Sequence, residues 1–319
     1  KKGRTLAAQH TQYTHNYTNP THDFSKELEA VFGVPIDPIA DGEPHRFDDP
    51  EGKRGNKACW YALHVHQNNF AAGAYGNFRK GDGYTKWNNS SQCLQSTGLY
   101  CPVSSAYIAH QKAQHSARKA MQQAESAKKA NTIWNLAHPA TTHHPYLKLK
   151  NISSLGLRVW KHQIVAALQN IAGERVNLQF IDAAGNKNYL KGGEVKGCFS
   201  LLGASQIPES GEVYICEGIA TGQTIWGRLK VPVVCAMSCG NLVPICTAIR
   251  KKYPNLGLVV AADNDHQTNG NPGIAKATEA ARTSSAQMRW PRACGNECTC
   301  TDFNDYANCK NSGALYEKY

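Results

Sequence analysis

A regular alternation of apolar runs and helix-forming stretches, which begins at Gly211, constrains the fold of this chain more than any other feature. Apolar runs of this kind, separated by helices, are typical of parallel strands whose two faces are both covered. The sequence therefore predicts an α/β domain over residues 211–319, with helices on both faces of a parallel sheet. The expected strands are 213–217, 231–236, 257–263 and 286–290, and the expected helices are 220–229, 241–253 and 273–282.

Acidic residues stand at the carboxyl ends of two of these strands. Glu217 closes the first strand, Asp263 closes the third, and Asp265 follows two residues later. Functional groups of open α/β sheets gather at this edge, and Mg²⁺ is held by a few carboxylates together with waters and substrate phosphates. The pattern predicts a metal-assisted phosphoryl-transfer site. Acidic residues before a helix also serve as N-caps without a metal, so that alternative stays open.

Two other nucleotide-binding patterns are absent. No G-x-G-x-x-G follows the first strand of the alternation, which argues against a dinucleotide site. No G-x-x-x-x-G-K-[ST] occurs in the sequence, which argues against a fused helicase. Gly218 and Gly222 are expected to keep the loop after Glu217 slim.

The first hundred residues indicate a flexible arm and a small mixed domain. Residues 1–22 are polar without an apolar period, and residues 23–33 form an amphipathic pattern with Asp23 as a candidate N-cap and Gly33 as a stop signal. A polar, Pro-rich loop is expected next. Alternating aromatic and small apolar residues then predict a β-meander within an α+β domain over 23–100, with strands at 58–65, 69–78 and 84–87.

A long helix and a second sheet-rich unit follow. Residues 104–137 lack Gly and Pro, which predicts a helix of about 50 Å inside a helical connector over 101–144. Its many Lys and Arg residues indicate either a solvated face or a nucleic-acid track. Residues 143–152 predict a Pro-initiated turn. Short strands separated by Gly-containing turns complete a unit over 145–210, at 157–160, 163–168, 175–182 and 187–190.

The charge balance favours a polyanionic partner. Lys plus Arg number 35 against 24 Asp plus Glu, a formal net charge of +11, which suits nucleic acid and says nothing about fold. No run approaches the roughly 18 to 20 apolar residues of a membrane span, and the opening residues lack the apolar core of a signal peptide. We expect a soluble, cytoplasmic protein without a membrane partner.

The cysteines fall into two groups. Five lie in apolar runs, where a free thiol behaves as a small buried hydrophobe: Cys59, Cys198, Cys216, Cys235 and Cys246. Near the end of the sequence, the spacing C-x3-C-x-C-x8-C is compatible with a four-thiolate zinc site but is not that of a standard ribbon, so free or partly buried thiols are the alternative. This cluster consists of Cys294, Cys298, Cys300 and Cys309.

Longer strings around the acidic residues resemble a known family. Residues 214–225, 259–265, 271–281 and 301–307 are similar to the Toprim domain shared by primases, topoisomerases and some nucleases, and in particular to the TraC-like DNA primases of conjugative plasmids and phages. The resemblance implies a Rossmann-like Toprim fold that binds Mg²⁺ or Mn²⁺. It assigns catalytic and metal-binding roles to Glu217, Asp263 and Asp265, and metal-binding roles to Asp302 and Asp305 as the later acidic pair.

The resemblance extends upstream. Residues 186–203 are similar to the stretch before the Toprim domain of bacterial DnaG-type primases, which implies nucleotide or template contacts for Lys187 and Lys196, with Arg158 and Lys191 as further candidates. Exposed lysines without that role are the alternative. Residues 143–147 and 156–160 resemble the opening of that catalytic core. Two departures stand out, since Thr221 occupies the place of an aspartate and no amino-terminal zinc ribbon is present.

The resemblance implies a DNA primase that makes short RNA primers from ribonucleoside triphosphates on single-stranded DNA, for plasmid or phage replication or conjugation, with a replicative helicase as a further partner. A Toprim nuclease would use the same carboxylates with water as the nucleophile. A non-catalytic single-strand-binding factor is the third hypothesis, with bases stacked on aromatic residues of the meander. Those residues are Trp60, Tyr75, Phe78, Tyr84 and Trp87, for which a place in the core is the alternative.

Overall fold

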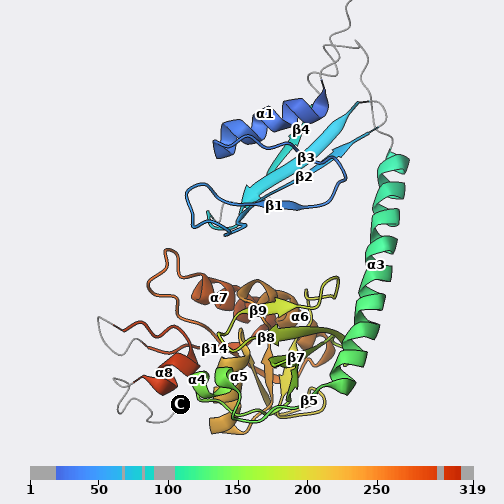
Figure 1. The fold of residues 1–319 in the computed structure, drawn as a ribbon. Coiled ribbons are helices and arrows are strands. Elements are labelled where there is room, and N and C mark those ends of the chain that lie inside the picture. Colours follow the sequence, from blue (N-terminus) through green and yellow to red (C-terminus); the bar gives the residue numbers. More distant parts are fainter. Residues whose placement is uncertain (1–18, 67–68, 81–82, 90–104, 293–297, 310–319) are drawn as a thin grey trace, which may run out of the picture. The chain divides into compact units, whose positions relative to one another are not determined.

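A computed structural model describes residues 19–66, 69–80, 83–89, 105–292 and 298–309. The chain divides into two compact units, Lys1–Ala113 and Gln114–Tyr319, with the boundary inside the long helix α3 (Ser105–Leu136). Figure 1 shows the elements of each unit. The predicted long helix is therefore confirmed, whereas most of the predicted arm lies outside the described residues. In the described part of the chain, every helix is too short or too polar to cross a membrane.

The first unit packs one helix on a four-stranded antiparallel sheet, the N-terminal sheet, whose order is β1-β2-β3-β4. The three meander strands are confirmed, and β1 is an additional strand in a segment that was predicted to be a loop. The helix starts earlier than predicted, because Asn19 rather than Asp23 caps it, and it ends at Gly33 with φ +71°. The elements are α1 (Pro20–Phe32), β1 (His45–Phe47), β2 (Cys59–Val65), β3 (Ala71–Asn77) and β4 (Thr85–Asn88).

The N-terminal sheet has one covered face. Phe24 and Leu28 of α1 are fully buried against Tyr61 and Tyr75. These two tyrosines point to the same side of the sheet because they are direct partners across β2 and β3. The ring of Trp87 also lies on this side, 4.9 Å from that of Phe24. The prediction that aromatic residues of the meander form a core is therefore correct for this side of the sheet.

The second unit contains a five-stranded antiparallel sheet, the middle sheet, whose order is β5-β6-β7-β8-β9. The last turns of α3 pack on it through Trp134, whose ring lies 4.8 Å from the guanidinium groups of both Arg158 and Arg175. The predicted strands are confirmed. The predicted turn is instead a six-residue helix, α4 (Pro145–Lys150), with Pro at its start and the His144 side chain as its cap. The strands are β5 (His138–Pro139), β6 (Leu157–Trp160), β7 (Gln163–Gln169), β8 (Arg175–Ile181) and β9 (Lys187–Tyr189).

The C-terminal sheet has the order β10-β12-β11-β13-β14. All its neighbouring strands are parallel except β10, which pairs antiparallel with β12 at the edge. The predicted parallel sheet is confirmed, but its edge strand β10 was not predicted, and its residues were assigned to the preceding unit. The elements are β10 (Ser200–Leu202), β11 (Glu212–Cys216), α5 (Ile219–Leu229), β12 (Val233–Cys235), α6 (Leu242–Lys252), β13 (Gly257–Ala261), α7 (Pro272–Ser284), β14 (Gln287–Arg289) and α8 (Phe303–Asn308).

Both faces of the C-terminal sheet are buried, as predicted. Tyr214 and Cys216 of β11 point toward α5 and share one core with buried residues of the middle sheet, such as Ile164. Val213 and Ile215 point to the other face, into the core that α6 and α7 cover (Figure 1). The two sheets of the second unit are therefore held together by a common hydrophobic core with α5 in it.

The two glycines after Glu217 have different roles. A Cβ atom on Gly222 would lie 2.3 Å from the Cys235 Sγ atom, so the close packing of α5 on β12 requires glycine there. A Cβ atom on Gly218 would meet nothing within 4 Å. The expectation of a loop glycine is therefore wrong for Gly222, which lies inside α5 and is needed for helix packing, whereas Gly218 precedes the helix and borders open space in the cavity wall.

Candidate active site

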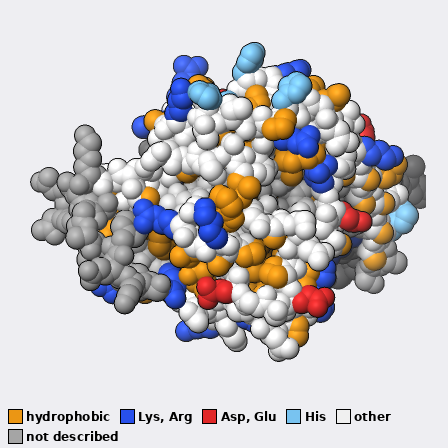
Figure 2. All heavy atoms as spheres, turned by 90° about the horizontal axis from the view of Figure 1, so that it is seen from below, with side chains coloured by type: hydrophobic (Ala, Val, Ile, Leu, Met, Phe, Trp, Pro, Cys, Tyr) orange, Lys and Arg blue, Asp and Glu red, His pale blue; other side chains and the backbone are white. Residues whose placement is uncertain are grey.

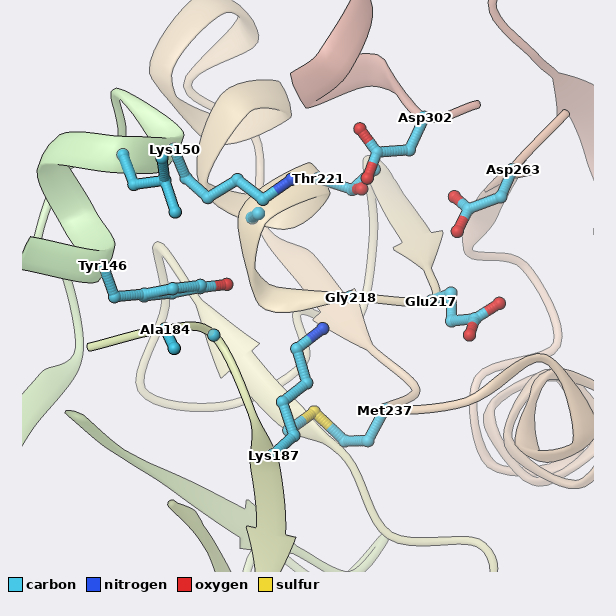
Figure 3. Close-up of a pocket in the computed structure, with 13 residues that line it drawn as sticks. Tyr146, Lys150, Ala184, Lys187, Glu217, Gly218, Thr221, Met237, Asp263 and Asp302 are labelled. Carbon is cyan, nitrogen blue, oxygen red and sulfur yellow. The ribbon is translucent and has the colours of Figure 1, made fainter. Parts of the chain in front are cut away.

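A cavity of about 220 Å³ opens at the carboxyl edge of the C-terminal sheet, where the strand ends meet α4 and β9 (Figure 3). Residues that are distant in sequence converge there because the common core brings the middle and C-terminal sheets together. Acidic, basic and apolar residues all contribute to the wall of this cavity. The lining residues are Tyr146, Leu149, Lys150, Ala184, Gly185, Lys187, Glu217, Gly218, Ala220, Thr221, Met237, Asp263 and Asp302.

Glu217 stands directly after β11. Its backbone oxygen accepts a 2.7 Å hydrogen bond from the Met237 N–H, so the loop after β12 fixes its place. The side chain is half-buried and lines the cavity. Burial and the nearby charge of Asp265 raise the pKa of the Glu217 carboxyl, although Lys187 opposes that rise.

Asp263 lies two residues after β13. Its Oδ1 atom is buried and has no hydrogen-bond partner in the described part of the chain. Burial raises the pKa of Asp263 to about 8, and the charges of Glu217 and Asp302 add to the rise. An orphaned carboxylate oxygen among like charges is an arrangement that a bound cation would stabilise.

Asp302 and Asp305 differ in their surroundings. The Asp302 carboxylate lines the cavity and caps α8 by accepting a 2.7 Å hydrogen bond from the Asp305 N–H. Asp305 forms an ion pair with Lys150 at 3.1 Å, and its own side chain does not line the cavity. The structure thus brings only Asp302 of this predicted pair to Glu217 and Asp263.

Asp265 supports the loop that carries Asp263. Its Oδ2 atom accepts a 3.0 Å hydrogen bond from the Gly273 N–H in the first turn of α7, and its own N–H donates to the Asn271 side chain. It is not part of the cavity wall. The helix-capping alternative therefore describes the hydrogen bonds of Asp265, while its charge still acts on Glu217.

Of the four basic residues predicted as nucleotide or template contacts, one lines the cavity and three do not. Lys187 lines the cavity from β9. Lys191 and Lys196 are exposed and do not line it. Arg158 donates hydrogen bonds to the backbone oxygens of Trp134 and Ala137 and stacks on the Trp134 ring, so it secures the end of α3 rather than the cavity.

The predicted basic track on α3 is exposed where the structure describes it. Lys129 pairs with Glu125 at 2.7 Å, which is the solvated-face alternative for that position. The basic residues of the track are Lys112, Arg118, Lys119, Lys128 and Lys129. Figure 2 shows one face of the molecule, on which Lys and Arg side chains are spread widely and acidic side chains are few.

Several cavity residues were not anticipated as site residues, among them Tyr146, Lys150 and Met237. Tyr146 is almost fully buried, and its hydroxyl has no hydrogen-bond partner in the described part of the chain. Burial, with the charge of Asp302, raises the pKa of Tyr146 to about 12, so the hydroxyl keeps its proton at neutral pH. The string HHPYLKLK could have pointed to Tyr146 and Lys150, because it forms a short capped helix that carries both residues, but it was predicted to be a turn.

The cavity has an acidic side and a basic side. Figure 3 shows the carboxylates of Glu217, Asp263 and Asp302 on one side, with the amines of Lys150 and Lys187 and the Tyr146 hydroxyl on the other. Hard oxygen donors and the orphaned Asp263 oxygen suit Mg²⁺ or Mn²⁺. Among the described residues, only a cysteine cluster has three ligand atoms within 4.8 Å of one another, so the carboxylates would share an ion with waters or phosphates.

The five cysteines predicted to be buried thiols are buried. In the terminal cluster, Cys298 is buried and Cys300 and Cys309 are half-buried, whereas Cys294 lies outside the described residues.

Comparison with known proteins agrees with this architecture. Residues 212–312 match the family described as Toprim domain. A protein of Escherichia coli named DNA primase TraC is 30% identical in an alignment of 295 residues that covers 85% of this chain and 26% of that protein. A second Escherichia coli protein of the same name is 26% identical in an alignment of 266 residues that covers 80% of this chain and 18% of that protein.

The chain spans 26% and 18% of the length of these relatives. Among solved structures, the primase fragment of the bacteriophage T7 primase-helicase protein is 16% identical, with a TM-score of 0.39, over 52% of this chain and 70% of that one. The chain is thus similar in sequence to proteins named DNA primase TraC, and strands β11 to β14 lie within the residues that match the Toprim domain.

Proposed function

We propose that this Toprim-domain chain synthesises short RNA primers on single-stranded DNA by metal-dependent nucleotidyl transfer, in the cytoplasm and in support of plasmid or phage replication or conjugation. One observation carries the proposal: Glu217, Asp263 and Asp302 face Lys150 and Lys187 across one cavity, where the C-terminal sheet meets α4 and β9. The similarity to proteins named DNA primase favours polymerisation over hydrolysis.

The reaction joins a 3′-hydroxyl to an incoming ribonucleoside triphosphate. The hydroxyl oxygen attacks the α-phosphorus, the bond between the α-phosphorus and the bridging oxygen breaks, pyrophosphate leaves, and the hydroxyl proton passes to water. When bound, Mg²⁺ or Mn²⁺ supplies positive charge at the attacking and leaving oxygens. Glu217, Asp263 and Asp302 would hold the ions, and Asp265 and Gly273 would keep the Asp263 loop in place.

The basic side of the cavity would bind the triphosphate. Lys187 comes from β9, and Lys150 comes from the end of α4, where Asp305 pairs with it. Ammonium groups opposite the carboxylates place a polyphosphate between two sources of positive charge, the lysines and the ions. The Tyr146 hydroxyl lies within reach of the same space and would donate a hydrogen bond to a phosphate or sugar oxygen.

The N-terminal unit would engage the template through the face of its sheet that α1 does not cover. The indole ring of Trp60 lies next to Gly76, where a Cβ atom in place of the glycine hydrogen would come within 3.1 Å of the indole nitrogen. The rings of Phe78 and Tyr84 lie 6.2 Å and 6.4 Å from the Trp60 ring, and they are 62% and 58% exposed. These three of the five predicted stacking residues form one group, which we call the aromatic face, and in it Trp60 is half-buried while Phe78 and Tyr84 are exposed.

Cations accompany the aromatic face. The Arg46 guanidinium lies 4.6 Å from the centre of the Phe78 ring, and the Lys86 amine lies 5.9 Å from that of Tyr84. Stacked bases next to phosphate-neutralising cations are the means by which sequence-tolerant single-strand binding is achieved. The aromatic face therefore has both components that a DNA strand requires, without a metal in this unit.

The primary experiment incubates the protein with single-stranded DNA, labelled ribonucleotides and Mg²⁺ or Mn²⁺. Labelled oligonucleotides that depend on template and metal would support the proposal. Shortened DNA without labelled product would identify a Toprim nuclease. Binding without either product, in protein whose metal content is verified, would identify a single-strand-binding factor.

Template engagement is tested separately by fluorescence anisotropy with oligo-dT at fixed salt. Trp60→Ala combined with Phe78→Ala should weaken binding on the order of 10-fold or more, since each stacked base is worth about 1–3 kcal/mol. Trp290→Ala, which removes a 48% exposed tryptophan of the other unit, is the matched control. Equal affinity of the double variant and the control would exclude the aromatic face. A replicative helicase remains a proposed partner, to be tested by co-purification.

A further inference from the structure

Three cysteine sulfurs meet beside α8, away from the carboxylate cavity. Cys298 is 8% exposed, Cys300 and Cys309 are half-buried, and their Sγ atoms all lie within 4.8 Å of one another. A tetrahedral zinc site with Zn–S bonds of about 2.3 Å needs sulfurs about 3.8 Å apart. The sulfurs are therefore near the separation that a shared zinc ion requires, without a rearrangement of the backbone.

The short helix α8 is what brings the sulfurs together. Cys298 and Cys300 precede it, and Cys309 ends it with its N–H bonded to the Tyr306 oxygen at 3.2 Å. Because a six-residue helix advances only about 9 Å along its axis, Cys300 and Cys309, which are separated by eight residues in sequence, can be neighbours. The helix itself is anchored by Asn304, which is buried and donates hydrogen bonds to the Lys150 oxygen and the Thr224 hydroxyl.

We propose that Cys298, Cys300 and Cys309 bind a Zn²⁺ ion as thiolates, at a structural site distinct from the catalytic cavity. Three thiols lose three protons when the ion binds, and the remaining coordination position is taken by water or another donor. This proposal does not depend on the proposed primase function, because it rests on the sulfur geometry alone.

The position of the site indicates its purpose. The Cys298 oxygen is hydrogen-bonded by the side chains of His266, at 2.7 Å, and Gln267, at 3.2 Å. The Thr301 oxygen accepts a 2.6 Å hydrogen bond from the Asn264 N–H. The segment 298–301 is thus fastened to the loop that carries Asp263 and Asp265, and it leads directly to Asp302. A zinc ion would fix this segment, and with it three of the predicted acidic residues.

A disulfide between two of these cysteines is the competing state. It would release two hydrogens to an oxidant and leave the third thiol free, whereas zinc binding leaves all three sulfurs at the reduced level. The two states differ in mass, in metal content and in the response to a reductant, so one set of measurements separates them.

The test measures zinc by elemental analysis of the full chain, purified with a reductant, stripped with a chelator, and reloaded with Zn²⁺. We expect one tightly bound zinc per chain. Bound zinc should also slow the alkylation of Cys298, Cys300 and Cys309, as followed by peptide mass spectrometry in the unmodified sequence. This second measurement needs no variant and therefore cannot be confused with misfolding.

Variants then assign the site. Cys300→Ser and Cys309→Ser should each weaken zinc binding about 100-fold or more, because each removes one of three thiolates. Cys246→Ala, which removes a buried thiol of α6, is the matched control and should bind zinc like the unmodified chain. The proposal is rejected if the reduced, reloaded protein holds no zinc, if the serine variants bind it as tightly as the control, or if the cysteines are found in a disulfide that zinc does not displace.

Discussion

Replacement of Asp263 by Asn tests the electrostatics of the cavity through stability as well as activity. The pKa of this carboxyl rises from 3.8 to about 8, mainly because of burial. A raised folded-state pKa means that ionisation costs the native state more than the unfolded state. The contribution of Asp263 to stability without a cation is therefore greatest below pH 3.8, and this contribution falls as the pH rises toward about 8.

The size of the effect follows from the shift. One pKa unit corresponds to about 1.4 kcal/mol, so the shift of about four units sets an upper limit of about 5 to 6 kcal/mol on the loss above pH 8. The net loss will be smaller, because Glu217 is coupled to Asp263 and can take up the proton instead. An uncharged amide at this position should remove the penalty altogether.

The assay is urea denaturation from pH 5 to pH 9, with and without Mg²⁺. Unmodified protein should lose stability with rising pH and regain it with Mg²⁺, since the cation replaces the proton as the neutralising charge. Asp263→Asn should be more stable than the unmodified protein at pH 9 without metal, should gain little from Mg²⁺, and should make no primers. Asp302→Asn serves as the comparison, because the Asp302 carboxylate has a hydrogen-bond partner that the Asp263 Oδ1 atom lacks.

Two outcomes would refute this reasoning. Equal stabilisation of Asp263→Asn and unmodified protein by Mg²⁺ would place the ion elsewhere. Primer synthesis by Asp263→Asn combined with Asp265→Asn would show that the catalytic site is misassigned, because the double variant removes two of the predicted ligand charges without altering the basic side of the cavity.

Three further predictions follow from single contacts. Lys187→Ala should lower kcat/KM about 10-fold or more and flatten the salt dependence of nucleotide use, whereas Lys196→Ala, outside the cavity wall, should not, and equal effects would reject the distinction. Gly222→Ala should lower the unfolding free energy by about 2 kcal/mol or more and Gly218→Ala by less, as measured in urea; the reverse order would contradict the packing at Cys235. Tyr146→Phe should raise ligand-free stability by up to about 1 kcal/mol and weaken nucleotide use in steady-state kinetics, and a loss of stability would reveal a partner for the hydroxyl.

The parts of the fold that could be predicted are those in which a continuous apolar run determines the structure. Strands β11 and β13 are buried on both faces, so their sequences alone identify them and place Glu217 and Asp263 at one edge. The strand β1 has three residues and only partial burial, so its pairing with β2 depends on the meander and not on its own pattern.

The parts that could not be predicted depend on contacts between distant segments. The strand β10 belongs to the C-terminal sheet because it pairs with β12, and no local sequence pattern reveals that pairing. Arg158 is of a residue type that often binds phosphate, yet its guanidinium donates hydrogen bonds to backbone carbonyl oxygens at the end of α3. Lys150 reaches the cavity only because α8, more than 150 residues later, packs on α4.

The presence of threonine at position 221, where an aspartate was expected from the resemblance, changes the charge of the cavity wall. The sequence resemblance to DnaG-type primases implies an aspartate at this place, whereas Thr221 is buried here in the first turn of α5 and lines the cavity. Another carboxylate would add repulsion where burial and three neighbouring acids already raise the pKa of Asp263 to about 8. With threonine there, the protein supplies fewer negative charges, so a second ion would have to be held largely by the triphosphate itself. This chain should therefore bind one ion without nucleotide and acquire the second only with it.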